Sequence, residues 1–123
     1  MRTLKFRAWI TTWGNAEPSA YMKYIDRLEL HIYMGNWERG GYKNAVFQQY
    51  TGLTDSLGNN IYECDILSHN KRIGTVYYNA DRAGFVLEWE YSSSQQNYVN
   101  LTCDVACESV NLGNIFENKE LLK

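Results

Sequence analysis

The stretch at residues 49–66, QYTGLTDSLGNNIYECDI, carries the pattern that decides the fold. Short strand-like runs, at 45–50 and 61–68, lie on either side of a polar segment that contains LGNN at 57–60. Glycine and asparagine favour a reversal of the chain because they tolerate backbone angles that other residues avoid. The stretch therefore predicts two strands joined by a turn.

The same kind of pattern continues along the rest of the chain. A period of two from Leu4 to Ile10 predicts a strand. The segment 21–34 fits helical spacing in its first part and strand spacing from Leu28 onward, where we predict a strand. Further strands are predicted at 73–78, 84–91, 99–103 and 110–116, with turns at 69–72 and 79–82.

These strands predict a mainly β fold with minor helix, namely a single antiparallel β domain over residues 1–123 that is barrel-like or sandwich-like. Asn118 is suited to cap a short C-terminal helical turn at 119–122. A chain of 123 residues can bury a core of its own. Hydrophobic residues at 45% and charged residues at 21% exclude an intrinsically disordered chain.

Composition also bounds the setting of the protein. Twelve basic and fourteen acidic side chains give a formal net charge of -2, which provides no long-range attraction for nucleic acid. No apolar run has the length of a signal peptide or of a membrane span. Three cysteines, an odd number, fit a reducing compartment better than a disulfide framework. We therefore expect a cytoplasmic protein that binds no membrane.

Three blocks of the sequence together resemble the YopX family of small proteins encoded by bacteriophages and prophages. The blocks are LKFRAW at 4–9, the stretch at 49–66 and LGNIFENKELL at 112–122. The residues singled out in the family motif are Tyr50, Gly52, Tyr62, Glu63, Asp65, Gly113, Asn114, Glu117 and Asn118. The resemblance implies phage or prophage origin, the cytoplasm of a bacterial host and association between copies. It implies no activity.

Two positions depart from the family pattern. The family has glycine where this chain has Cys64, and proline where it has Lys119. Glycine is typical of positions with a positive backbone φ angle, so the resemblance predicts that Cys64 adopts a conformation that cysteine disfavours. The change at Lys119 is milder because proline at the first helical position is merely favourable.

Paired carboxylates are the first candidate for chemistry. Glu63 and Asp65 lie two residues apart, so on a strand both would project from one face about 7 Å apart, a separation usable for acid–base catalysis or for a divalent cation. The alternative, which we favour, is that they accept hydrogen bonds from turn backbone or pair with Lys71 or Arg72.

The cysteines are the second candidate. Cys103 and Cys107 have the spacing of half a zinc site, with Cys64, His31 or His69 as candidates to complete it, but a second close pair of ligands is missing. We favour a role as buried small hydrophobes. A nucleophilic thiol would need His31 or His69 as its base, and the spacing selects neither. The sequence thus predicts a protein that is not an enzyme and holds no cofactor and no metal.

Binding is the remaining class. Cationic and aromatic side chains alternate at two places, in the first strand and around a glycine-rich loop. These candidate binding residues for protein or nucleic acid are Lys5, Arg7, Trp9, Trp37, Arg39, Tyr42 and Lys43. Ten tyrosines and four tryptophans favour protein contacts. We expect a protein-binding or self-associating accessory protein whose partner is itself or a host protein, such as a nuclease or defence complex that it inhibits. The alternative is a nucleic-acid-associated protein.

Overall fold

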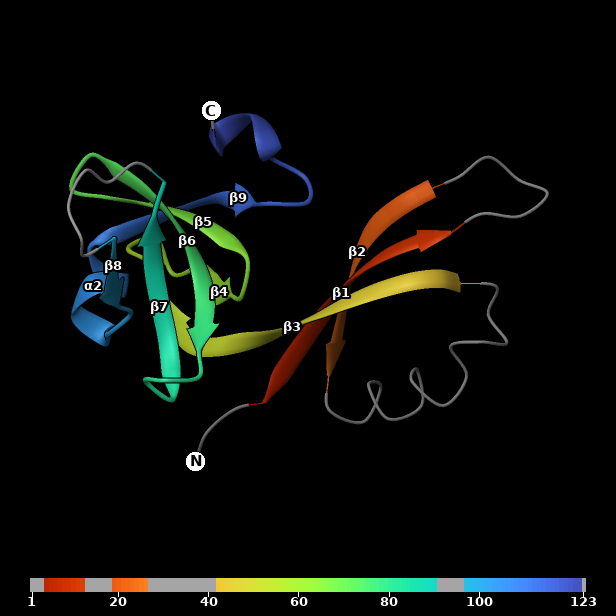
Figure 1. Cartoon of the computed structure of the whole chain (residues 1–123), viewed down its shortest axis with the longest axis horizontal. Helices are drawn as coiled ribbons and strands as arrows, with labels where there is room; N and C mark the ends of the chain where they lie inside the picture. The colour runs from red at the N-terminus through yellow and green to blue at the C-terminus, as the bar shows by residue number, and fades with distance from the viewer. Residues whose placement is uncertain (1–3, 13–18, 27–41, 91–96, 123) are drawn as a thin grey trace. The chain divides into compact units, whose positions relative to one another are not determined.

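The computed structural model describes residues 4–12, 19–26, 42–90 and 97–122, with the backbone alone at 12, 19, 26 and 42–44 (Figure 1). The predicted strand at 28–34 and the candidate residues His31, Trp37 and Arg39 lie outside the described residues. The chain divides into two compact units, unit 1 at Met1–Tyr50 and unit 2 at Thr51–Lys123. Each unit has a hydrophobic core of its own.

Unit 1 is built on three antiparallel strands. These are β1 (Lys5–Thr12), β2 (Ser19–Asp26) and the first part of β3 (Tyr42–Thr54). β1 lies in the middle, so that Ile10 is opposite Tyr21 of β2 and Ala45 of β3. Ala8, Ile10 and Ile25 are buried and form the core, against which Ala45 packs. Strand spacing, and not helical spacing, therefore describes the segment around Tyr21.

Unit 2 contains the larger sheet and the only helices of the described residues. Its strands are β4 (Asn60–Tyr62), β5 (Asp65–His69), β6 (Arg72–Asn79), β7 (Gly84–Trp89), β8 (Tyr98–Asn100) and β9 (Ser109–Asn114). Its helices are α2 (Cys103–Cys107) and the 3-10 turn η1 (Lys119–Leu122). The strand orders are β2-β1-β3-β4 and β8-β7-β6-β5-β9. The second sheet is antiparallel and curled like half a barrel, which confirms the predicted mainly β fold (Figure 1).

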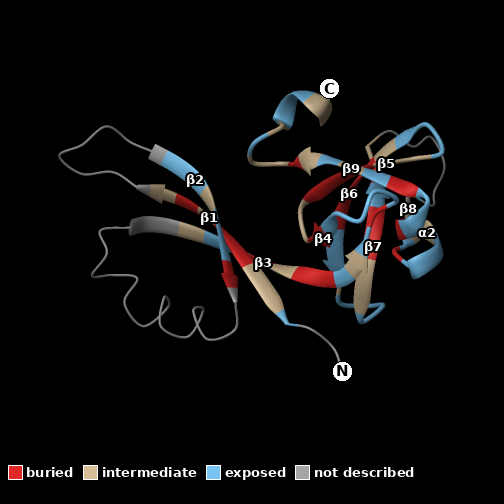
Figure 2. Cartoon of the chain, turned by 180° about the vertical axis from the view of Figure 1, so that it is seen from behind, coloured by how far each residue is buried: buried red, intermediate tan, exposed pale blue. Residues whose placement is uncertain are grey.

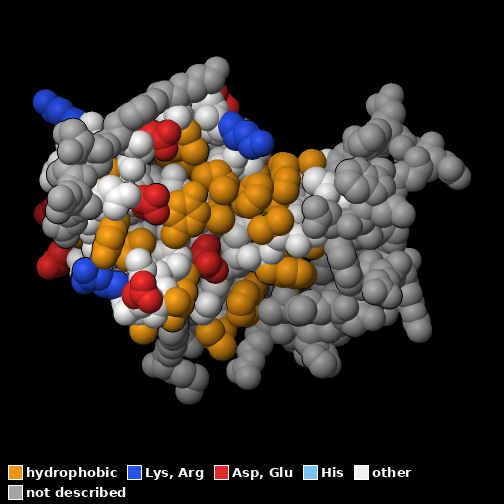
Figure 3. Space-filling model, in the orientation of Figure 1, with side chains coloured by type: hydrophobic (Ala, Val, Ile, Leu, Met, Phe, Trp, Pro, Cys, Tyr) orange, Lys and Arg blue, Asp and Glu red, His pale blue; other side chains and the backbone are white. Residues whose placement is uncertain are grey.

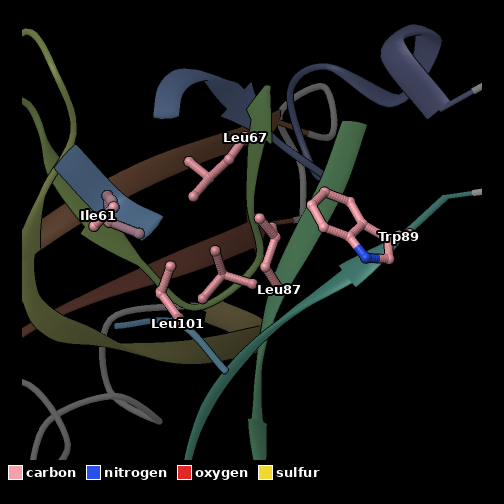
Figure 4. Packing of buried hydrophobic residues seen from close by; sticks show 7 residues of the cluster. Ile61, Leu67, Leu87, Trp89 and Leu101 are labelled. Atoms are coloured by element: carbon pink, nitrogen blue, oxygen red, sulfur yellow. The ribbon is translucent and has the colours of Figure 1, made fainter. Parts of the chain in front are cut away.

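The core of unit 2 lies on one face of this sheet. The register places Val76 opposite Leu87, and Leu87 opposite Val99, so these side chains share one face. In Figure 4, Leu67, Leu87 and Leu101 point into a common interior. The buried members of this cluster are Ile61, Leu67, Val76, Leu87, Trp89, Leu101 and Ala106, and the buried positions are red in Figure 2.

Turn chemistry explains the connections. Gly58 has φ +84° in the turn predicted at 57–60, and its N–H donates to the Asp55 carbonyl at 3.1 Å. Asn70 and Lys71 both have positive φ between β5 and β6, as a two-residue hairpin turn requires. The turn predicted at 79–82 joins β6 to β7. The C-terminal helical turn at 119–122 is confirmed as η1.

The helix α2 replaces the end of a predicted strand. The alternation at 99–103 predicts an extended chain through Cys103, whereas the helix begins there. Thr102 caps it, because its Oγ1 accepts a hydrogen bond from the Val105 N–H at 3.3 Å. Cys103 and Cys107 are both exposed free thiols. The prediction that these thiols are buried small hydrophobes is therefore wrong.

Cys64 occupies a tight turn between β4 and β5. Its φ is +70°, which confirms the backbone angle that the glycine of the YopX pattern predicts. Two hydrogen bonds hold the turn in place: the Cys64 N–H donates to the Val76 carbonyl at 2.7 Å, and the Ile115 N–H donates to the Cys64 carbonyl at 3.0 Å. A residue with a Cβ is thus kept in the left-handed region by its neighbours, at a cost in stability.

We predict that Cys64→Gly raises the free energy of unfolding by about 1 kcal/mol, because glycine has no Cβ and relieves the steric cost of the left-handed backbone. Part of this gain is offset because glycine has more conformational freedom in the unfolded chain. Urea denaturation followed by tryptophan fluorescence measures the change. Cys64→Ala is the matched control, since it removes the thiol and keeps the Cβ. If the two variants are equally stable, backbone strain is not what separates cysteine from glycine at this position.

Candidate functional site

Two carboxylates are buried in unit 2, and Asp55 is the first. It is only 5% exposed. Its Oδ1 accepts hydrogen bonds from the N–H groups of Leu57 at 2.9 Å and Asn59 at 2.8 Å. Its Oδ2 accepts from the Asn111 N–H at 2.8 Å and from the Asn59 side chain at 3.3 Å. Burial by itself raises the pKa of Asp55, but the hydrogen bonds from Asn111, Asn59 and Leu57 outweigh burial and hold the pKa below its usual value.

Asp65 is the second buried carboxylate, at 1% exposed. Its Oδ2 accepts hydrogen bonds from the Tyr62 N–H and from the Asn111 side-chain amide, both at 2.8 Å. Asn111 therefore binds Asp55 through its backbone and Asp65 through its side chain. It also donates to the Asn60 carbonyl at 3.2 Å and accepts from the Gly113 N–H at 3.0 Å. We call Asp55, Asp65 and Asn111 the carboxylate network.

The candidate arrangement of Glu63 and Asp65 on one face of a strand, which the sequence does not favour, is not formed. Glu63 and Cys64 form the turn between β4 and β5, and only Asp65 belongs to a strand. Asp65 accepts a hydrogen bond from the backbone of Tyr62, the last residue of β4 before the turn, which is close to the alternative that the sequence favours. Among the described residues, no group of three or more His, Cys, Asp or Glu side chains could hold a metal ion.

The C-terminal motif folds onto itself. Asn114 Oδ1 accepts hydrogen bonds from the N–H groups of Phe116 at 3.0 Å and Glu117 at 2.9 Å, and its amide donates to the Glu117 carboxylate at 2.9 Å. Asn118 Oδ1 accepts from the Asn114 N–H at 3.1 Å, so its side chain binds back toward β9. Gly113 has φ +140°, and a Cβ there would overlap the Asn118 side chain.

The remaining residues of the family motif also lie in the framework. Tyr50 and Tyr62 are buried, and Gly52 has φ +88° within β3. Next to Gly52, Thr51 Oγ1 donates to the Ile61 carbonyl at 2.8 Å and accepts from the Leu53 N–H at 3.2 Å. These contacts of the motif residues build turns and strand pairings, which gives a structural reason for their pattern.

The candidate binding residues of β1 do share one face. Lys5, Arg7 and Trp9 alternate with Phe6, Ala8 and Ile10 along the strand. Arg7 is only 2% exposed, and its Nε donates to the Gln48 Oε1 at 2.6 Å. The Lys5 Nζ lies 5.6 Å from the centre of the Tyr50 ring. Tyr42 and Lys43 are at the start of β3, where only the backbone is described.

A second surface lies on the outer side of the five-stranded sheet. The register places Glu88 opposite both Thr75 and Tyr98, and places Tyr77 opposite Val86. Alternation along β7 directs these side chains away from the core residues Leu87 and Trp89. We call this surface the Tyr77 face and define it by Tyr77, Glu88, Glu90 and Tyr98; Thr75 and Val86 on the same face are buried. Figure 3 shows hydrophobic side chains on the side of unit 2 that carries β6 and β7, with acidic side chains among them.

The Tyr77 face combines aromatic and acidic groups, of which Tyr77 and Glu88 are exposed and Glu90 and Tyr98 are half-buried. Tyr77 is 38% exposed. Partial burial raises the pKa of Tyr77, and the negative charges of Cys64, Glu88 and Glu90 raise this pKa further. Arg82 holds Tyr98 in place, because its Nε donates to the Tyr98 hydroxyl at 3.1 Å. The sequence contains the signal for this surface, since Val86, Glu88 and Glu90 alternate with the core residues of β7, but alternation alone does not mark an outer face as a binding surface.

The lowered pKa of Asp55 predicts a loss of stability in acid. A carboxyl whose pKa is lower in the folded than in the unfolded chain stabilises the fold above the unfolded pKa of about 3.9, and this contribution is lost as the pH falls through the folded pKa. We predict that Asp55→Asn lowers the free energy of unfolding at pH 7 by about 1–3 kcal/mol and flattens its fall below pH 4. Denaturant unfolding between pH 7 and pH 2 measures both effects.

Asp81→Asn is the matched control, because Asp81 is exposed at the tip of the β6–β7 hairpin. We expect it to change the free energy of unfolding by less than about 0.5 kcal/mol at pH 7. An acid profile of Asp55→Asn that follows the profile of the unmodified chain would show that Asp55 does not set the acid limit.

Comparisons with known proteins agree with this architecture. The chain is similar to the crystal structure of protein EF1440 from Enterococcus faecalis, with 22% sequence identity over 100% of both chains and a TM-score of 0.53. This similarity supports the fold alone. No curated protein matches the chain. In the described ranges, no helix is long and apolar enough to cross a membrane.

The family comparison covers nearly the whole chain. The family described as YopX protein matches residues 5–123, which include β1, the carboxylate network and the C-terminal motif. The match confirms the resemblance that the three sequence blocks indicate. The chain therefore belongs to the YopX family.

Proposed function

We propose that the protein is a phage or prophage accessory protein of the bacterial cytoplasm that acts, without catalysis, by binding protein, and that one of its partners is a second copy of itself. The observation that carries this proposal is the Tyr77 face, on a unit of net negative charge, where Tyr77 and Glu88 are exposed and Glu90 and Tyr98 are half-buried. Tyrosines of this kind supply contact area at low entropic cost. Carboxylates beside them select a positively charged partner.

The charges of the two units support a second copy as the partner. Unit 1 has seven basic and four acidic side chains, a net charge of +3, whereas unit 2 has five basic and ten acidic side chains, a net charge of -5. Their sum is the -2 of the whole chain. Opposite charges attract, so unit 1 of one copy and unit 2 of another favour each other. Such a contact joins two different surfaces and is heterologous.

Unit 1 offers a matching surface among its described residues. Lys23 on β2 and Phe47 on β3 both lie opposite Ala8 of β1, so the three side chains share one face. Lys23 is exposed. Phe47 is also exposed. An ammonium group beside an aromatic ring complements the carboxylates and tyrosines of the Tyr77 face. A basic surface on a host nuclease or defence complex, which the protein would inhibit, fits the same face.

Two variants with complementary defects test this contact. Glu88→Lys with Glu90→Lys removes the acidic side, and Lys23→Glu with Phe47→Ser removes the basic side. Because the contact is heterologous, we predict that each variant alone is monomeric and that an equal mixture forms a dimer. Sedimentation velocity in EDTA measures this, and the unmodified chain is expected to associate in low salt and to dissociate in about 0.5 M salt.

Asp81→Lys with Glu120→Lys is the matched control, since it makes the same change in net charge on unit 2 away from the Tyr77 face. We expect it to associate like the unmodified chain. Circular dichroism verifies that every variant is folded. A monomeric unmodified chain at all concentrations, or association that survives in both double variants, would refute this contact.

Nucleic-acid binding is the second candidate, and one observation favours it: Lys5 and Trp9 share a face of β1 in the unit of net charge +3. We predict that, if this candidate holds, a fluorescent single-stranded oligonucleotide binds with an affinity that falls steeply with salt. Lys5→Ala would then reduce the slope of log K against log salt by about one. Lys71→Ala, in unit 2, is the control. Fluorescence anisotropy without measurable binding at low salt eliminates this candidate.

A further inference from the structure

The exposed thiols of α2 form a pair that the proposed function does not use. Cys103 and Cys107 are four residues apart on one helix, so they lie on the same side one turn apart. Ala106 is 1% exposed and packs in the core of unit 2 together with Val105. The helix is thus fixed by its inner side, and the two free thiols are exposed.

The spacing of the two thiols suits a metal ion better than a disulfide. Side chains at this separation on a helix have Cβ atoms about 5–6 Å apart, whereas a disulfide needs about 3.5–4.5 Å. A disulfide between them would therefore distort α2. A zinc ion in a tetrahedral site bonds each sulfur at about 2.3 Å and so holds two sulfurs roughly 3.8 Å apart. Two cysteines whose side chains lean toward each other can place their sulfurs at this distance without any change in the helix.

One copy of the described chain supplies too few ligands for zinc. Structural zinc sites have four ligands, and no group of three or more His, Cys, Asp or Glu side chains within the described ranges could hold a metal. His69 does not complete the pair, because its Nδ1 lies 3.2 Å from Ser109 Oγ and its Nε2 lies 3.3 Å from the Asn70 amide. Two ligands from each of two copies give the required four.

We propose that Cys103 and Cys107 of two copies bind one zinc ion and so join the copies through α2. Four S–H bonds break, four Zn–S bonds form, and the four protons pass to the buffer, so binding weakens as the pH falls. Asp104 and Glu108 are exposed beside the thiols and repel the same groups of the other copy. This contact therefore depends on the metal, whereas the contact of the Tyr77 face depends on opposite charges.

A zinc titration in about 0.5 M salt tests the site, because this salt concentration suppresses the charge-dependent contact. The reduced chain is mixed with zinc chloride, separated from free metal by gel filtration, and measured for metal content and for mass by sedimentation velocity. We expect one zinc per two chains and a doubled mass, both reversed by EDTA. Cobalt in place of zinc is expected to show the visible and near-ultraviolet absorption of a tetrahedral thiolate site.

The third cysteine provides a matched control. Cys103→Ser and Cys107→Ser are each expected to lose the retained metal and the doubled mass, whereas Cys64→Ser keeps both. One zinc per chain without a change in mass, no retained zinc, or equal loss in Cys64→Ser would each overturn the proposal. None of these results affects the proposed self-association, which is measured in EDTA and at low salt.

Discussion

Unit 2 depends on the hydrogen bonds of one asparagine. Asn111 donates to the buried carboxylates of Asp55 and Asp65, and its contacts connect β9 to the turn after β3 and to the start of β5. A buried carboxylate without partners costs several kcal/mol. Asn111 adds its donors to those of Leu57 and Asn59 at Asp55 and of Tyr62 at Asp65. The network joins β5 and β9, which pair in the five-stranded sheet that also carries the Tyr77 face. Asp65 is both a residue of the family motif and a member of this network.

The parts of the fold that sequence predicts well are those with local causes. The alternation in β1, β6 and β7 reflects one buried and one outer face, and the turns at 57–60, 69–72 and 79–82 follow from residues that accept positive φ or hydrogen-bond their own backbone. Cys64 belongs to this class, because its angle is a property of the turn. The helix α2 does not, since five residues are too few to establish helical periodicity and only Thr102 marks its start.

The candidate site is harder to predict because exposure is a tertiary property. Arg7 alternates with the core residues of β1, as predicted, and so lies on the face of the sheet opposite the core. It is nevertheless buried, because it packs against Gln48 on that same face. Cysteine is a residue type that is commonly buried. The helix α2 nevertheless exposes both Cys103 and Cys107. Tyr77 and Glu88 belong to different strands and become neighbours only because β6 pairs with β7.

The carboxylate network also sets the order in which the protein becomes stable during synthesis. Asn111 is 56 residues after Asp55 and 46 residues after Asp65, so both acids leave the ribosome long before their shared donor. Contacts of such sequence separation form late because a long loop must close first. Until β9 emerges, the nascent chain exposes the open edge of β5, and both acids lack the donors that Asn111 supplies. Chaperone protection is therefore needed most in the interval between the synthesis of β5 and the release of the C-terminus.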